Sequence, residues 1–85
     1  MTEMADAVLS EVRRIMAQEL DVTRPVALDD ELAAFPELDS IGLITLAVGL
    51  EDRFRVKLTG ADAGPLVTVR DLARLIARRR AQDGS

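Results

Sequence analysis

The chain has 85 residues, and its 15 acidic and 11 basic side chains give a formal net charge of −4, with no histidine and no cysteine. A chain of this length accommodates one small domain. The absence of Cys excludes a disulfide framework, and the absence of His excludes a Ser-His-Asp catalytic group. The acidic clusters lack the Asp/Asn ladder and glycine of a calcium loop, so we expect no metal site.

Targeting and membrane-spanning patterns are missing from the sequence. No basic start precedes an apolar run, and no apolar run is long enough to cross a bilayer. We therefore expect a soluble, cytoplasmic monomer. Residues 1–85 are expected to form a single domain, with a core over about residues 5–80 and a flexible tail over 81–85.

The acidic residues are concentrated in one part of the chain. Between Leu28 and Asp52 there are seven acidic residues and no Lys or Arg, whereas the rest of the chain has eight acidic and eleven basic residues. A one-sided field of this kind attracts basic protein surfaces and repels nucleic-acid phosphates. The charge distribution therefore indicates protein partners and no nucleic acid.

The first expected element is an amphipathic helix from Ala7 to Leu20. Its apolar residues recur at spacings of three and four and include Val8, Val12, Ile15 and Met16. The next segment, Asp21 to Leu38, contains two prolines and no sustained period, which indicates a long loop. Loops of this length are uncommon in small domains and often functional. We expect its apolar residues to anchor it on the core: Leu28, Leu32 and Phe35.

A second helix is expected to begin at Asp39 or Ser40 and to run to about Phe54, because Asp is a favoured N-cap and strong helix formers follow it. At 100° per residue, one sector of this helix collects the residues expected in the core: Leu43, Leu46, Ala47, Leu50 and Phe54. Another sector, beside Ser40, is expected to face solvent although its residues are apolar: Ile41, Ile44 and Val48.

Small residues form a third stripe on the same helix, at Gly42, Thr45 and Gly49. Each interior glycine costs about 0.5–1 kcal/mol of helix stability relative to alanine. We therefore expect another helix or a bound chain to approach this stripe closely.

The segment T-G-A-D-A-G-P at 59–65 leaves room for a helical turn at most. The stretch from Thr68 to Asp71 has the pattern of a capping box, which predicts a last helix with Leu72, Leu75 and Ile76 buried. No alternating strand pattern is present. The expected fold class is all-α: three main helices plus a short third helix or turn, with a long loop between helices one and two.

Ser40 stands at the expected start of the second helix. A serine there commonly acts as a cap for free backbone N–H groups. The same place suits a serine that bears a phosphodiester, because free N–H groups and the positive end of the helix dipole favour phosphate. The long acidic loop before Ser40 and the apolar stripe beside it favour the second interpretation.

Three segments carry a family pattern: L-D-S-I at Leu38 to Ile41, L-x-x-x-L-E-x-x-F at Leu46 to Phe54, and T-V-x-D-L at Thr68 to Leu72. With them the chain resembles the acyl and peptidyl carrier proteins, whose serine accepts the 4′-phosphopantetheine arm of coenzyme A. The resemblance covers nearly the whole chain. It implies a small acyl-carrier-like bundle with the modified serine at the start of helix two and a pocket between helices two and three.

The resemblance also implies roles for single residues. Ser40 is the implied attachment site, and Asp39 is implied to support the modification by helping the transferase to hold metal and present the hydroxyl. Partner recognition is implied for Ile41, Ile44, Val48, Glu51 and Asp52. The implied cargo pocket includes Leu46, Leu50, Phe54 and Leu66, with Leu66 near its mouth.

The implied function is carriage without catalysis. The arm would hold an acyl or aminoacyl group as a thioester and deliver it to partner enzymes in a specialised lipid, polyketide or other secondary-metabolite pathway. The implied partners are a phosphopantetheinyl transferase, an acyl- or aminoacyl-loading ligase and downstream acyl-processing enzymes.

The chain departs from the family pattern at a few positions. Glu37 stands where many members have Gly, while Gly42 and Thr45 stand where carriers of primary fatty-acid synthesis usually have acidic residues. The partner face is therefore more apolar than in those carriers, which indicates a specialised member. L-D-S-I-G also resembles the D-alanyl carriers, and D-S-I occurs in peptidyl carriers, so an amino-acid cargo stays open as an alternative.

Two other classes of function compete with the carrier. An enzyme would need a base for Ser40, but Lys57, the only lysine of the chain, lies beyond the far end of helix two, about 20 Å or more away. A cofactor-free helical interaction module would use Ser40 only as a cap and would grip a partner helix with Ile41, Ile44 and Val48.

Overall fold

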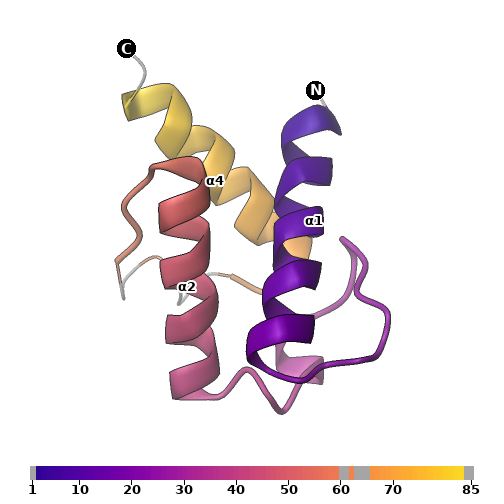
Figure 1. Ribbon diagram of the computed structural model, residues 1–85. Helices are drawn as coiled ribbons and strands as arrows, with labels where there is room; N and C mark the ends of the chain where they lie inside the picture. Colours follow the sequence, from indigo (N-terminus) through magenta and orange to yellow (C-terminus); the bar gives the residue numbers. More distant parts are fainter. Residues whose placement is uncertain (1, 60–61, 63–65, 84–85) are drawn as a thin grey trace.

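The computed structural model describes residues 2–59, 62 and 66–83, and these residues form three α-helices and one 3-10 turn (Figure 1). The helices are α1 (Thr2–Glu19), α2 (Ser40–Phe54) and α4 (Val69–Asp83), and the turn η1 (Leu32–Ala34) lies in the loop between α1 and α2. This confirms the expected all-α class and the long first loop. None of the helices in the described part of the chain is both long and apolar enough to cross a membrane.

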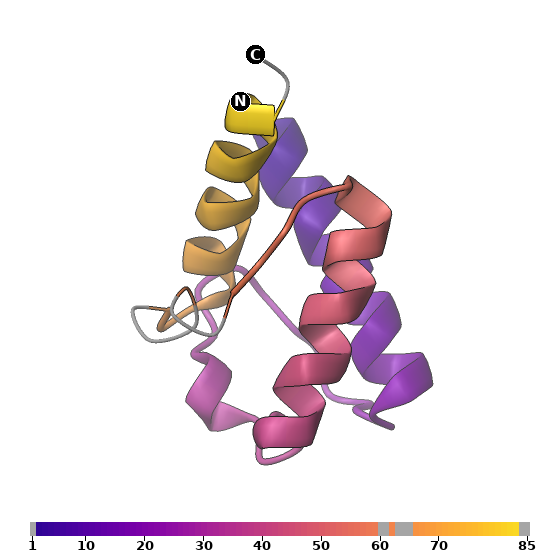
Figure 2. The ribbon, with the colours of Figure 1, turned by 90° about the vertical axis from the view of Figure 1, so that its left-hand side faces the viewer.

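The helices form a bundle in which α1 packs against both α2 and α4. α1 and α2 run in opposite directions, and α4 crosses behind them (Figures 1 and 2). The first turn of α1 and the last turn of α4 lie at one end of the bundle, whereas α2 begins at the other end (Figure 1).

Helix α1 buries the predicted apolar stripe, with Val8, Val12, Ile15 and Met16 almost fully inaccessible. It begins at Thr2, earlier than the expected start at Ala7. The first turns contain few core residues, so the apolar period that predicted the helix could not reveal them. After the helix, Asp21 adopts the left-handed conformation.

Helix α2 has the predicted bounds. The Asp39 side chain caps it by accepting a hydrogen bond from Gly42 N, and Arg55 ends it in the left-handed conformation. Leu46, Leu50 and Phe54 are buried as expected. Leu43 was expected beside them but is 37% exposed, because it borders a cavity between α2 and α4 rather than the packed core.

Close approach at the small-residue stripe is confirmed. A Cβ atom at Gly49 would lie 2.5 Å from Cδ1 of Ile15 on α1, so the glycine lets the two helices meet. The same helix pair is joined by Glu11 of α1, a buried carboxylate that pairs with Arg14 and with Arg53 of α2. A Cβ atom at Gly42 would instead meet the loop that precedes α2.

The first loop is anchored by apolar side chains and by backbone hydrogen bonds. Leu32 and Phe35 are buried as expected, Leu28 is half-buried, and further loop residues are buried at Val22, Val26 and Leu38. The loop also bonds to the start of α4 through three main-chain contacts: Leu32 N to Val67 O (2.8 Å), Val69 N to Asp30 O (3.1 Å) and Arg70 N to Leu28 O (2.8 Å).

Helix α4 begins with the predicted capping box. Asp71 N donates to Thr68 Oγ1 at 3.2 Å, and Thr68 N donates to Asp71 Oδ2 at 3.1 Å. Leu72, Leu75 and Ile76 are buried as predicted. The helix continues to Asp83, into the segment 81–85 that was expected to be a tail.

The short third helix or turn was expected within 59–65. Of that segment only Thr59 and Asp62 belong to the described residues, so this expectation lies outside them.

Candidate functional site

Ser40 is the first residue of α2 and is exposed, as is Asp39 before it. Two bonds fix the turn around this serine. Asp39 Oδ1 accepts from Gly42 N at 2.9 Å, and Asp39 O accepts from Leu43 N at 2.8 Å. Asp39 rather than Ser40 therefore caps the helix, and the serine hydroxyl stands at the positive end of the α2 dipole.

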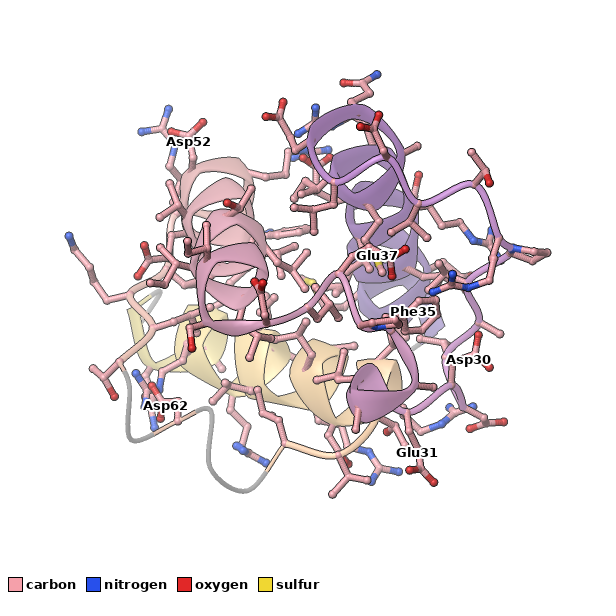
Figure 3. The ribbon with its side chains drawn as sticks, turned by 90° about the horizontal axis from the view of Figure 1, so that it is seen from below. Asp30, Glu31, Phe35, Glu37, Asp52 and Asp62 are labelled. Atoms are coloured by element: carbon pink, nitrogen blue, oxygen red, sulfur yellow. The ribbon has the colours of Figure 1, made fainter. Side chains whose placement is uncertain are left out.

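The chain that leads to Ser40 is held from outside by Arg24. Arg24 Nη2 lies 3.0 Å from Glu37 Oε1, and its guanidinium stacks 5.0 Å from the centre of the Phe35 ring. The hydrogen bond and the charge of Arg24 hold the pKa of Glu37 below its ordinary value. Figure 3 shows Glu37 and Phe35 on this stretch, seen from the end of the molecule where α2 begins. Sequence reasoning missed Arg24, since its partner lies 13 residues away with no periodic relation.

The apolar stripe beside Ser40 faces solvent as predicted, with exposures of 75% for Ile41, 62% for Ile44 and 56% for Val48. Ile44 and Val48 border a shallow groove whose other side is formed by Arg14 and Glu19 of α1. Exposed branched apolar residues in a row are unusual on a monomer and indicate a surface for protein contact.

The two acidic residues expected to assist recognition differ in their surroundings. Glu51 is half-buried, and its Oε2 accepts a hydrogen bond from Leu58 N at 2.8 Å, so this carboxylate supports the turn that follows α2. Asp52 is exposed and points away from the bundle (Figure 3). Of the two, Asp52 is the one that a partner can reach directly.

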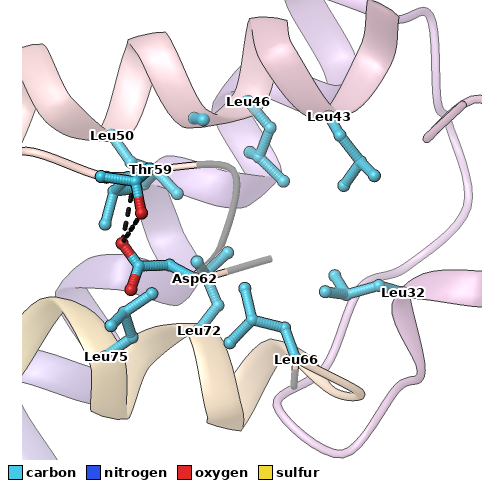
Figure 4. A pocket seen from close by; sticks show the side chains of 11 residues that line it. Leu32, Leu43, Leu46, Leu50, Thr59, Asp62, Leu66, Leu72 and Leu75 are labelled. Carbon is cyan, nitrogen blue, oxygen red and sulfur yellow. Dashed lines mark hydrogen bonds between the residues drawn. The ribbon is translucent and has the colours of Figure 1, made fainter. Parts of the chain in front are cut away.

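A small cavity of about 60 Å³ lies between α2 and α4 (Figure 4). Among the residues that the structure describes, its lining is leucine apart from Ala47, Thr59 and Asp62. Three of the four residues expected in a cargo pocket line this cavity: Leu46, Leu50 and Leu66. The fourth, Phe54, is buried elsewhere in the core. Other lining residues were expected only as core or loop-anchor residues, or were not named, and not as part of a pocket: Leu32 of the first loop, Leu43 of α2, Leu58 after α2, and Leu72 and Leu75 of α4.

The polar atoms at the cavity wall bind one another. Asp62 Oδ2 accepts from Thr59 N (2.8 Å) and Thr59 Oγ1 (3.0 Å), and Asp62 Oδ1 accepts from Arg79 Nη2 at 2.6 Å. The bonds from Thr59, with the charge of Arg79, hold the pKa of Asp62 below its ordinary value. This carboxylate is therefore paired, and the other described residues that line the cavity, apart from Thr59, are aliphatic.

Residues 10–76 match the protein family described as "Phosphopantetheine attachment site". The chain belongs to this family of carrier proteins. Its sequence is similar to an acyl carrier protein of Campylobacter concisus (strain 13826), with 27% identity over 73 residues that cover 85% of this chain and 95% of that protein. No solved structure matches the chain with comparable statistical significance to this sequence match.

A phosphopantetheine carrier is not a catalyst, and it needs a hydroxyl that a transferase can reach. The exposed Ser40 at a helix N-terminus fits that need, because the dipole and first-turn N–H groups favour the phosphodiester that results. The described residues contain no group of three His, Cys, Asp or Glu side chains that could hold a metal ion. The described residues thus offer an exposed hydroxyl at the start of α2, an exposed apolar stripe beside it and a cavity lined mainly by leucine.

Proposed function

We propose that Ser40 bears the 4′-phosphopantetheine arm and that the chain carries an aliphatic acyl group on it as a thioester. The observation that supports this most is the exposed hydroxyl of Ser40 at the capped start of α2, next to an exposed apolar stripe, in a chain of the phosphopantetheine-attachment family. Asp39 supports the modification by fixing the turn that presents the hydroxyl.

In the modification, Ser40 Oγ forms a bond to the phosphorus that carries pantetheine in coenzyme A. The pyrophosphate bond breaks, adenosine 3′,5′-bisphosphate leaves, and the hydroxyl proton passes to the transferase. Once attached, the arm supplies the thiol that forms the thioester. The chain itself presents the hydroxyl, offers a docking surface and shelters the cargo.

The cavity favours an acyl over an aminoacyl cargo. Among the described residues its lining is aliphatic apart from Thr59 and Asp62, and the Asp62 carboxylate is already paired with Thr59 and Arg79. An ammonium group placed there would lose its hydration without gaining a partner, which is costly. An aliphatic chain would bury apolar surface at about 25 cal/mol per Å². Leu46, Leu50 and Leu66 are the proposed cargo contacts from the expected set.

Ile41, Ile44 and Val48 are the proposed recognition residues for a phosphopantetheinyl transferase, an acyl-loading ligase and downstream acyl-processing enzymes of a specialised pathway. Asp52 adds an exposed charge near the far end of the stripe, where it favours partners with a basic group. Apolar contact would supply specificity and the acidic surface the rate of encounter, so the association rate should fall as ionic strength rises.

The test is the intact mass of the protein after incubation with coenzyme A, Mg²⁺ and a broad-specificity phosphopantetheinyl transferase. The wild type should gain one phosphopantetheine group and Ser40→Ala none. Ser10→Ala, the same change at an exposed serine of α1, is the matched control and should gain one group. Attachment to Ser40→Ala would refute the site. A wild type left unmodified, beside a control carrier that is modified, would favour a cofactor-free interaction module.

A further inference from the structure

The backbone of Glu37 lies directly against Gly42. A Cβ atom at position 42 would stand 2.0 Å from Glu37 O and 3.0 Å from Glu37 C. These are main-chain atoms, which cannot swing aside as the end of a flexible side chain can. The loop therefore reaches its position only because residue 42 has no side chain.

The same glycine is also bonded by Asp39, whose Oδ1 accepts from Gly42 N at 2.9 Å and would lie 3.5 Å from a Cβ atom at position 42. Between these two contacts Leu38 is buried, and its N–H donates to Phe35 O at 2.9 Å. The turn from Glu37 to Gly42 is thus closed by two contacts to Gly42. One comes from the Glu37 carbonyl and the other from the Asp39 side chain. Ser40 lies inside this turn.

The loop is also fixed from the solvent side. The Glu37 carboxylate pairs with Arg24, and Arg24 stacks on the buried Phe35 ring. The Glu37 side chain is therefore tied to Arg24 on the solvent side, while the Glu37 carbonyl lies against Gly42.

We propose that Gly42 is a positioning residue for the modification of Ser40. By admitting the Glu37 carbonyl, it lets the turn close on α2 and so sets the place where the Ser40 hydroxyl meets the transferase. This inference rests on the proposed attachment to Ser40. A side chain at position 42 would push Glu37 outward and move Asp39, while the docking stripe on α2 would keep its exposure.

The experiment measures kcat and KM of the transferase for Gly42→Ala and for the wild type. Displacement of a reacting group by about 1 Å can cost about a hundredfold in rate, and we expect kcat to fall about tenfold or more, with KM changed less than about twofold. Gly49→Ala is the matched control, since it makes the same change on the same helix but contacts the end of the Ile15 side chain. It should keep kcat within about twofold of the wild type.

A second substitution that relieves the contact at position 42 distinguishes a positioning role of Gly42 from general damage to the helix. In Glu37→Gly the carbonyl of residue 37 gains the freedom to rotate away, so Gly42→Ala added to that background should change kcat by less than about twofold. The double variant also carries the test if Gly42→Ala alone fails to fold, judged by circular dichroism.

Three results would overturn the inference. The first is a folded Gly42→Ala variant that is modified with the wild-type kcat. The second is a fall in kcat for Gly49→Ala as large as that for Gly42→Ala. The third is a Glu37→Gly, Gly42→Ala double variant whose kcat is no higher than that of Gly42→Ala alone. In all three cases the wild-type protein still accepts the arm, so the proposed attachment to Ser40 would stand. If the wild type accepts none, the proposed function fails first and this inference falls with it.

Discussion

Arg79 Nη2 lies 2.6 Å from Asp62 Oδ1 and joins α4 to the segment that follows α2. The same guanidinium donates through Nη1 to Lys57 O at 2.9 Å. Asp62 and Thr59 both line the α2–α4 cavity (Figure 4). Arg79 therefore holds one wall of the cavity in place from outside it.

Replacing Arg79 by alanine should destabilise the carrier and expose its cargo. The pair is partly exposed and screened by solvent, so its loss together with the bond to Lys57 O should lower Tm by only a few degrees. In the acyl-loaded protein the thioester should also react faster with hydroxylamine. Scanning calorimetry and thioester decay measure the two effects. Arg80→Ala, the same change at the next, exposed position, is the control, and equal effects in both variants would contradict the role of Arg79.

Replacing Ile44 should weaken docking without harming the fold, because its side chain is 62% exposed. Loss of a central apolar contact costs about 1–2 kcal/mol, which would raise KM for a partner enzyme about five- to thirtyfold. Ile44→Ser removes the apolar surface alone, and Ile44→Asp adds a charge, so comparison of the two separates these contributions. Val67→Ser, at another exposed apolar residue, should keep the wild-type KM. Unchanged turnover in both Ile44 variants would argue against the stripe.

Stability should fall in acid and stay nearly constant around neutral pH. Hydrogen bonds from Thr68 N and Val67 N hold the pKa of Asp71 below its ordinary value of 3.8, and the hydrogen bond from Arg14 lowers that of Glu11 from 4.5. The unfolded chain takes up protons first as pH decreases, so the stabilisation is present above about pH 4.5 and is lost as pH falls through the folded pKa values.

The chain has no histidine, and so no side chain with an ordinary pKa near 6.5 adds a pH dependence between about pH 6 and 8. Urea unfolding at about one-unit intervals from about pH 2 to pH 8 measures how the free energy of unfolding depends on pH. Asp71→Asn should lose less stability on acidification than the wild type, because one of the responsible carboxylates is gone. A wild-type free energy of unfolding that rises below pH 4 would contradict this account.

The features that follow from local rules could be predicted from the sequence. Asp39 as an N-cap and the 100° step between residues sufficed for the bounds of α2 and for the exposure of Ile41 and Ile44. Thr68 and Asp71 likewise predicted the start of α4. Each of these depends on residues within a few positions of one another, where helix geometry is nearly fixed.

The features that depend on the path of a loop could not be predicted. Close approach to Gly42 was expected, but from a helix or a bound chain, and a loop carbonyl occupies that place. The pairs Arg24–Glu37 and Asp62–Arg79 join residues 13 and 17 positions apart, and no period relates them. Phe54 shares its sector with Leu50, yet only Leu50 lines the cavity, because the cavity is bounded by residues from outside α2.

The first loop is attached to α4 through main-chain atoms, with Leu32 bonded to Val67 and Asp30 bonded to Val69. Such bonds form with almost any side chain in place, so substitutions in this part of the loop need not detach it. Glu31 is exposed between two of these bonds. A substitution at Glu31 should therefore change the charge on the surface of the loop while the backbone scaffold beneath it stays the same.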